Sequence, residues 1–145
     1  MEVTLRAIDR SNWDKCCRLT VSAAQRAFVA SNAYSLAQAA YEPDTWPMGI
    51  FCEGELVGFL MWGFDSEHCV WEVYRLMVDE AHQGRGIGRA ALQKLLELVR
   101  KKHGSVLLHI GANPDNAVAL ALYESMGFRR NGQNAYGEVV LELPL

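Results

Sequence analysis

Residues 83–89 form a glycine-dense stretch between a predicted strand, which ends at Val78, and a strong helix pattern. Gly84, Gly86 and Gly88 lack a Cβ atom, so the backbone there can adopt unusual dihedral angles and let a ligand approach closely. A helix that begins in such a loop directs several unpaired N–H groups at one point, with the positive end of its dipole behind them. These residue types and their spacing predict a cradle for phosphate groups.

Two common nucleotide motifs do not fit this loop. A dinucleotide fingerprint, G-x-G-x-x-G, would need its third glycine at the position of Arg89, and a P-loop would need a Gly-Lys pair that is absent. The pattern present is Gln83-x-x-Gly86-x-Gly88. Taken alone, this loop also has a simpler interpretation, a glycine-rich turn without a ligand.

A second motif lies downstream, between Asn116 and Phe128. It has the form N-x-x-A-x-x-L-Y-x-x-x-G-F and includes Tyr123 and Gly127. The two motifs, in this order and with one helix and one strand between them, resemble those of the GNAT superfamily of N-acetyltransferases. The resemblance covers the chain from Met48 onward. It implies an enzyme that transfers the acetyl group of acetyl-CoA directly to a primary amine, with acetyl-CoA as co-substrate.

Length and composition agree with such an enzyme. The 145 residues, of which half are hydrophobic and 21% charged, predict one domain that spans residues 1–145. The net charge is −3 and the longest basic run is three residues, 100–102, so we expect no nucleic-acid partner. No apolar run reaches membrane-spanning length. The four cysteines show no C-x-x-C spacing and the four histidines are scattered, which predicts a reduced, cytoplasmic protein without a metal.

The periodicity of apolar residues predicts alternating strands and helices. Strands are expected at residues 3–8, 48–53, 56–64, 69–78, 106–110, 128–130 and 138–143. Helices are expected at residues 11–28, 35–41 and 86–103, and from 114 or 115 to 126. This order predicts an α/β fold with a mixed, mostly antiparallel central sheet and helices on both faces, in which residues 69–110 form a right-handed parallel crossover. The resemblance implies a splayed, GNAT-like sheet, with the cofactor between the strands that end at Val78 and Ile110.

The resemblance also assigns the cofactor contacts. The peptide groups of Leu76, Met77 and Val78 would pair with the pantetheine arm, and the Val78 N–H would face the thioester oxygen as an oxyanion donor. Their side chains can serve the strand core at the same time. The other expected cofactor residues are Gln83, Gly84, Arg85, Gly86, Ile87, Gly88, Arg89 and Asn116. For the two arginines, ordinary solvent exposure stays open, and for Asn116 so does a helix-capping role, in which Asp115 and Asn113 are rivals.

Tyr123 is the expected proton donor. Its helix is otherwise apolar, so its phenol needs a polar partner or a ligand, and the resemblance places it beside the departing sulfur. A phenol pKa of ~10 lies close enough to a thiol pKa of ~8.5 for useful proton transfer. The alternative is a core tyrosine whose hydroxyl reaches the surface.

Glu72 is the expected general base. Strand alternation, in the absence of a bulge, puts Glu72, Tyr74, Leu76 and Val78 on one face. Some family members carry a glutamate at this offset before the glycine loop, and partial burial would raise its pKa toward that task. Pairing with Arg75 or plain solvent exposure are the alternatives, and His82 is a rival base.

The acceptor amine is predicted from residues 28–47 and 128–132, which resemble the bacterial spermine/spermidine acetyltransferase subgroup. A polyamine site should combine carboxylates with aromatic faces, and Tyr34, Glu42, Asp44 and Trp46 cluster in the sequence to supply both. Tyr74 departs from this pattern, because some polyamine enzymes of the family carry an acid near that position. An ordinary acidic loop, a protein or antibiotic amine as acceptor, and a catalytically silent acetyl-CoA-binding domain stay open. Dimers are frequent in the family, so a homodimer is compatible with the resemblance.

Overall fold

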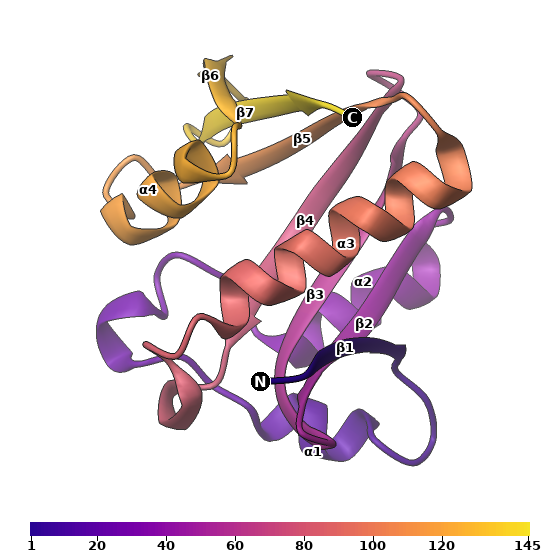
Figure 1. Cartoon of the computed structure of the whole chain (residues 1–145), viewed down its shortest axis with the longest axis vertical. Helices are drawn as coiled ribbons and strands as arrows, with labels where there is room; N and C mark the ends of the chain where they lie inside the picture. Colours follow the sequence, from indigo (N-terminus) through magenta and orange to yellow (C-terminus); the bar gives the residue numbers. More distant parts are fainter.

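Seven strands form one sheet in the order β1-β2-β3-β4-β5-β7-β6 (Figure 1). The structure is a computed structural model that describes all 145 residues. Every neighbouring pair of strands is antiparallel except β4 and β5, which are parallel. This confirms the predicted mixed, mostly antiparallel sheet. The strands are β1 (Val3–Ala7), β2 (Thr45–Cys52), β3 (Glu55–Asp65), β4 (Val70–Val78), β5 (Leu107–Ala112), β6 (Arg129–Gln133) and β7 (Val139–Pro144).

Helices cover both faces of the sheet, as predicted (Figure 1). Helices α3 and α4 belong to one buried cluster, and α1 and α2 pack against a second cluster on the other face. None of the helices combines the length and the apolar character needed to cross a lipid bilayer. The helices are α1 (Trp13–Arg18), α2 (Asn32–Tyr41), α3 (Ile87–His103) and α4 (Ala117–Ser125), with short 3₁₀ turns η1 (Ala23–Gln25) and η2 (Glu80–His82).

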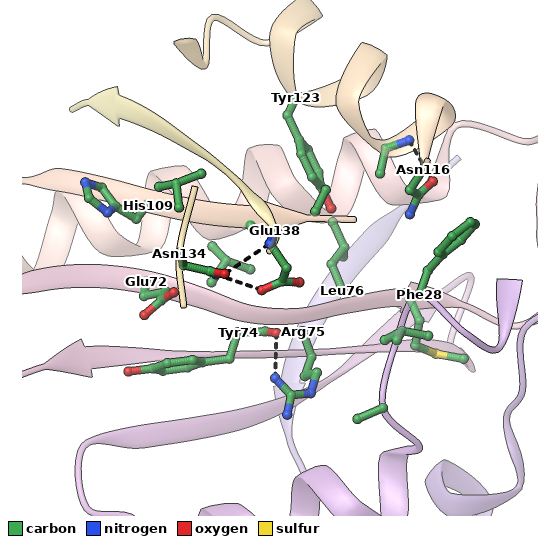
Figure 2. Close-up of a pocket in the computed structure, with 18 of the residues that line it drawn as sticks. Phe28, Glu72, Tyr74, Arg75, Leu76, His109, Asn116, Tyr123, Asn134 and Glu138 are labelled. Carbon is green, nitrogen blue, oxygen red and sulfur yellow. Dashed lines mark hydrogen bonds between the residues drawn. The ribbon is translucent and has the colours of Figure 1, made fainter. Parts of the chain in front are cut away.

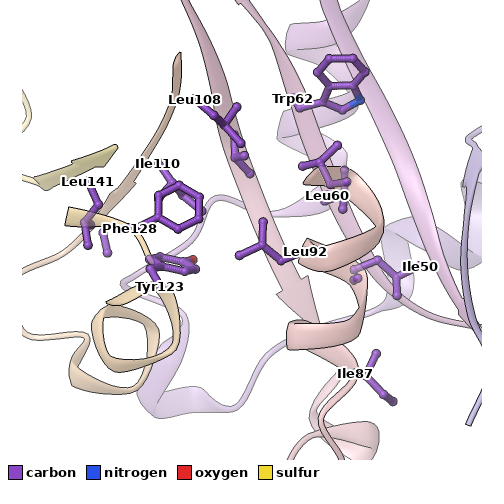
Figure 3. Close-up of a cluster of buried hydrophobic side chains, with 14 of the residues drawn as sticks. Ile50, Leu60, Trp62, Ile87, Leu92, Leu108, Ile110, Tyr123, Phe128 and Leu141 are labelled. Atoms are coloured by element: carbon purple, nitrogen blue, oxygen red, sulfur yellow. The ribbon is translucent and has the colours of Figure 1, made fainter. Parts of the chain in front are cut away.

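The larger cluster holds α3 and α4 against the sheet (Figure 3). Along α3, Ile87, Ala91, Leu95 and Val99 recur every four residues and are at most 1% exposed, so one stripe of the helix is removed from water. Fully burying such a side chain stabilises the fold by roughly 1.5–3 kcal/mol. The start of α3 is thereby fixed against the sheet at the glycine loop.

The predicted long helix at residues 11–28 is wrong. Helix α1 ends at Arg18, and Leu19 is already extended at φ −65° and ψ 138°. The backbone N–H of Thr20 then donates to Asp79 Oδ1 at 2.9 Å, and its carbonyl accepts from the Glu80 N–H at 2.8 Å. These contacts with the chain after β4 replace helical hydrogen bonds, so tertiary structure overrides the local pattern.

Strands β4 and β5 part soon after they meet. They pair only from Trp71↔Leu108 to Val73↔Ile110, after which β5 stays with β7 while β4 continues along β3. At the same point β4 carries a bulge, because Val73 faces Trp62 and Arg75 faces Met61, which leaves Tyr74 without a partner. The expected opening between the two strands is therefore present.

The bulge also corrects the predicted alternation along β4. The extra residue shifts the pattern by one position, so Leu76 and Val78 follow Val73 onto the α3 face. Tyr74 instead packs with the cluster beneath α1 and α2. The prediction that Glu72 shares a face with Leu76 and Val78 is wrong, because the bulge lies between them.

Gly63→Ala tests how the sheet holds the loop before β2. A Cβ atom at Gly63 would lie 2.1 Å from the Asp44 carbonyl oxygen, which accepts a hydrogen bond from the Phe64 N–H. The loop must move to make room, so we expect a loss of about 1–3 kcal/mol in the free energy of unfolding, measured by denaturant titration. Gly88→Ala is the control, because its Cβ atom would meet neighbours at ordinary distances of 3.8 and 3.9 Å. Equal stability of the Gly63→Ala variant and the parent would contradict this packing.

Candidate active site

A single open groove of about 1850 Å³ follows the line where β4 leaves β5 (Figure 2). The glycine loop and the first residues of α3 and α4 line it, and so do the β6–β7 turn and the loop before β2. The groove therefore joins both sequence motifs with the acidic segment at residues 42–44.

The phosphate-cradle geometry is present at the start of α3. Gly86 is its N-cap at φ 80°, no side chain caps the helix, and the first helical bond runs from the Ala90 N–H to the Gly86 carbonyl. The N–H groups of residues 87–89 thus have no helical acceptor. A Cβ atom at Gly84 or Gly86 would meet no heavy atom within 4 Å, so the space beside the loop is open. An anionic pyrophosphate fits this end of the groove.

The long side chains around the loop have separate tasks. Gln83 Nε2 donates to the Val78 carbonyl and to Gln25 Oε1, each at 2.9 Å, and so ties the loop to the end of β4. Arg89 lines the groove but donates to Ser125 Oγ of α4 at 2.6 Å. The Arg85 guanidinium lies 3.3 Å from His82 Nδ1 and outside the groove lining. Phosphate contacts by the two arginines stay a prediction.

The exposed backbone of β4 offers hydrogen bonds to a ligand. The Asp79 N–H donates to the Val57 carbonyl at 2.8 Å, and antiparallel alternation from that bond turns the Leu76 and Val78 peptide groups away from β3. With β5 absent beyond Val73, the Leu76 N–H and carbonyl and the Val78 N–H face the groove, whereas Gln83 already occupies the Val78 carbonyl. Met77 also lines the groove, but its peptide group faces β3 and its side chain is buried on the α1–α2 side, so the predicted backbone pairing of Met77 with the pantetheine arm is not supported.

Tyr123 lies at the junction of the core and the groove. Its side chain is 6% exposed, its ring is 6.1 Å from the Phe128 ring, and its hydroxyl makes no hydrogen bond within the chain. The hydroxyl points from α4 toward Leu76 of β4 (Figure 2). Burial, and then the charge of Glu138, raise the Tyr123 pKa to about 12. The phenol therefore keeps its proton at neutral pH, as a proton donor must.

Asn116 has the capping role that the sequence allowed. Its Oδ1 accepts a hydrogen bond from the Ala119 N–H at 3.3 Å, so Asn116 caps α4. Asn113 Oδ1 accepts instead from the Asp115 N–H. Asn116 also lines the groove, and its amide nitrogen makes no hydrogen bond within the chain, so capping and ligand binding are compatible.

Glu72 is a half-buried carboxylate with no hydrogen bond or ion pair in the chain, and it lines the groove. Burial, then the charges of Asp65 and Glu138, raise its pKa to about 7, against the smaller opposing effects of His68 and Arg75. The expected alternative of an ion pair with Arg75 is wrong, because that guanidinium donates to the Tyr74 carbonyl and to Gln38 Oε1. Near neutral pH, Glu72 can exist in both protonation states.

His82, the rival base, lies in η2 beyond the far end of β4. Its Nε2 is 3.8 Å from a Glu55 carboxylate oxygen and its Nδ1 contacts Arg85. Glu72 and His82 thus occupy opposite ends of the strand, and only Glu72 lies near the point where β4 and β5 part.

Three of the four predicted acceptor residues lie in the groove, and one does not. Tyr34, Glu42 and Asp44 line the groove, and neither carboxylate has an ion pair. Tyr74 lies among the acids: burial, then the charges of Glu72, Asp65, Glu42 and Asp44, raise its pKa to about 12. Tyr74, which is not itself an acid, therefore lies near carboxylates from its own strand, from the end of β3 and from the loop before β2.

Trp46 is the exception, and its prediction is corrected. Strand β2 begins at Thr45, so alternation turns Thr45 toward the groove and Trp46 away from it. The indole packs 4.9 Å from the Trp62 ring and 6.2 Å from the Trp71 ring. Trp46 therefore belongs to an aromatic cluster near the end of α3, outside the groove.

Sequence reasoning missed several polar groove residues, among them Asp65, His68, Asn134 and Glu138. Asp65 and His68 lie in the β3–β4 turn, where the His68 Nδ1 is 2.8 Å from Asp65 Oδ2. Asn134 and Glu138 come from the β6–β7 turn and carry no motif. Asp65, Glu67 and His68 also bring possible ligand atoms within 4.8 Å of one another, although Asp65 already accepts bonds from its turn. The absence of a metal stays a prediction.

The fold and this groove define an acyl-CoA-dependent transferase, and the comparisons agree. Residues 12–128 match the acetyltransferase (GNAT) family, so the chain belongs to that family and is an acetyl-CoA-dependent N-acetyltransferase.

Individual relatives act on different amines. The chain is 29% identical to the spermine/spermidine N(1)-acetyltransferase of Bacillus subtilis over 97% of each chain. It is 34% identical to the N-alpha-acetyltransferase RimI of Mycobacterium tuberculosis, over 90% of this chain and 80% of that one. The aminoglycoside acetyltransferase AAC(6')-Ib, solved with coenzyme A, superposes with a TM-score of 0.82 at 16% identity, covering 99% and 95% of the two chains.

Gly86→Asp tests the phosphate cradle. Acetyl-CoA should stabilise the folded parent by mass action, by about 2.7 kcal/mol at a concentration 100-fold above Kd, and so raise its melting temperature. In the variant a carboxylate would face the pyrophosphate, and we expect that acetyl-CoA no longer raises the melting temperature. Gly104→Asp is the matched control, because Gly104 has a similar φ of 74° in open space but lies outside the groove. A Gly86→Asp variant that binds acetyl-CoA as tightly as the parent would exclude this site.

Proposed function

We propose that this N-acetyltransferase acetylates a polyamine such as spermidine or spermine. The observation that carries the proposal is a set of three carboxylates, Glu42, Asp44 and Glu72, that line one groove without a cation partner in the chain. Unpaired carboxylates in a shared groove favour a ligand that carries several positive charges. Overall similarity to the Bacillus subtilis enzyme along 97% of both chains supports the same acceptor class.

The arrangement of the groove supports direct transfer of the acetyl group from acetyl-CoA to the amine. The acetyl-CoA pyrophosphate would bind at the start of α3, and the pantetheine arm would run along the Leu76 and Val78 peptide groups. The Val78 N–H would stabilise the negative charge on the thioester oxygen as the amine attacks. Glu72 would accept a proton from the amine, and Tyr123 would donate one to the departing sulfur.

A protein amino group is the second candidate acceptor, because RimI of Mycobacterium tuberculosis is an N-alpha-acetyltransferase and is 34% identical to this chain. The groove is open, so it has room for a chain terminus. The charge pattern favours the polyamine, since an α-amino group brings one positive charge to a wall with three unpaired carboxylates.

Tyr123→Phe tests proton donation. The hydroxyl makes no hydrogen bond within the chain, so its removal should leave stability and acetyl-CoA affinity within a few-fold of the parent. The thiolate would lose its proton source, and we expect kcat to fall by about 100-fold or more. Tyr41→Phe is the control, because Tyr41 is 88% exposed and outside the groove. Turnover of the Tyr123→Phe variant within twofold of the parent would move proton donation to another group.

An amine panel tests the acceptor. Thiol release from acetyl-CoA should be faster with spermidine or spermine than with a lysine-containing peptide or an aminoglycoside. The apparent KM for spermine should rise with ionic strength more than that for a monoamine, since salt screens each charge. Glu42→Gln should raise the spermine KM by about two- to fivefold and a short diamine KM less. Glu97→Gln is the control, because it makes an equal charge change on the exposed side of α3. It should leave the KM for spermine and the KM for the short diamine unchanged.

Equal salt responses for spermine and a monoamine would contradict the polyamine proposal. So would the absence of polyamine turnover at millimolar concentrations. Either result would leave the acetyltransferase activity intact, and the fastest amine of the panel would then define the acceptor class.

A further inference from the structure

Glu138 is a carboxylate that the turn between β6 and β7 holds in one orientation. Its Oε1 accepts a hydrogen bond from Asn134 Nδ2 at 2.9 Å, and its backbone N–H donates to Asn134 Oδ1 at 3.1 Å. The Asn134 N–H in turn donates to the Glu138 carbonyl at 3.1 Å. Three hydrogen bonds between the same two residues fix the carboxylate before any ligand arrives.

The turn delivers this carboxylate to the point where β4 and β5 part. A Cβ atom at Gly111 would lie 3.1 Å from Glu138 Oε1, so the carboxylate fills the space that a side chain at Gly111 would take. Gly111 directly follows Ile110, which makes the last parallel pair with Val73. In Figure 2, Glu138 lies between Glu72 of β4 and Tyr123 of α4. All three residues line the same groove.

Acetylation of an ammonium group releases two protons from one nitrogen. The first must leave before attack, because only the neutral amine has a lone pair, and the second leaves once the C–N bond has formed. A single carboxylate holds one proton at a time. A second proton acceptor at the point where β4 and β5 part would let both proton transfers go to the protein, so that no water molecule has to act as the base.

We propose that Glu138 is a second catalytic carboxylate, which binds the reacting ammonium and takes its first proton, while Glu72 takes the second. This inference rests on the proposed amine acetylation. The amine then attacks the thioester carbon, the C–N bond forms and the carbonyl electrons move to oxygen. When the C–S bond breaks, the sulfur keeps the electron pair and receives the Tyr123 proton. The proton on Glu72 replaces the one that Tyr123 gave, and the proton on Glu138 passes to water.

The charges around Glu72 and Glu138 favour this assignment of one proton to each carboxylate. Glu138 faces Glu72 and the Tyr123 hydroxyl, and its negative charge raises the pKa of both. Asp65, His68 and Arg75 also act on Glu72, from the β3–β4 turn and from β4 itself. His109, the titratable groove residue on β5, has its Nε2 3.2 Å from a Glu142 carboxylate oxygen on β7. Two neighbouring carboxylates repel each other, and a cation such as an ammonium between them relieves that repulsion.

Glu138→Gln tests the catalytic role, with the fastest amine of the panel as acceptor. The substitution keeps the shape and the Asn134 contact, and we expect kcat/KM at pH 7 to fall by about 100-fold or more. Raising the pH toward the amine pKa should restore the rate, about tenfold per pH unit, because water then supplies neutral amine. Glu142→Gln is the same change four residues further along, on β7 and outside the groove lining, and should stay within twofold of the parent.

A variant rate within twofold of the parent at pH 7 would overturn the proposal. So would a 100-fold loss that rising pH does not restore, since a merely structural defect has no reason to respond to amine protonation. An unchanged melting temperature shift with acetyl-CoA verifies that the variant is folded.

Carboxyl ¹³C NMR titration gives a readout that needs no acceptor. Removal of the Glu138 charge should lower the pKa of Glu72, whereas Glu142→Gln should leave it in place. An unchanged Glu72 titration in the Glu138→Gln variant would overturn the paired arrangement. If no amine is acetylated, the proposed function fails, and this titration still decides whether the two carboxylates act as a pair.

Discussion

The early separation of β4 from β5 is the constraint on which the rest of the structure depends. Parallel pairing ends at Val73↔Ile110, and the bulge at Tyr74 lies immediately beyond it. A strand edge without a partner normally exposes peptide groups that need hydrogen bonds. In this fold the Leu76 and Val78 groups face the groove, so an incoming extended ligand can take the place of the missing strand. The bulge lies where the free edge of β4 begins, and it also changes the face of the sheet on which the following side chains lie.

The groove that this separation opens has two ends, which suit ligands of opposite charge. Uncapped N–H groups at the start of α3 make one end suitable for phosphate, whereas Glu42, Asp44, Glu72 and Glu138 make the other end suitable for a cation. Acetyl-CoA carries an anionic pyrophosphate and a polyamine is cationic, so each should be attracted to one end and repelled from the other. The thioester would then lie between them, close to Tyr123 and the parting point of the strands.

Much of the fold could be predicted from the sequence, because the patterns that indicate its strands, helices and loops are local. The two glycine-containing motifs predicted α3, α4 and their loops, and the alternation of apolar residues predicted all seven strands to within a few residues. The predictions that failed depend on contacts between residues that are far apart in the chain. The Thr20–Asp79 contact ends a helix that the local pattern would continue, and nothing in β4 itself announces a bulge at Tyr74.

The site residues divide in the same way. Glu72 and Tyr123 were found because they lie at fixed offsets from motifs, and both line the groove. Trp46 was misplaced because it was expected in a loop, whereas β2 begins at Thr45 and strand alternation turns the Trp46 side chain away from the groove. Glu138 lies 66 positions after Glu72, and only the β5–β7 register together with a glycine at position 111 brings the two together. Chain separation of that kind leaves no pattern in a single sequence.

Amide hydrogen exchange, measured residue by residue with and without acetyl-CoA, tests the central claim most directly. If the cofactor completes the open edge of β4, exchange should slow at Leu76 and Val78 and at residues 87–89. Met77 is the internal control, because its N–H already faces β3 and should change little. Slowing that is equal at Met77 and its neighbours, or absent from both β4 and the start of α3, would contradict the account.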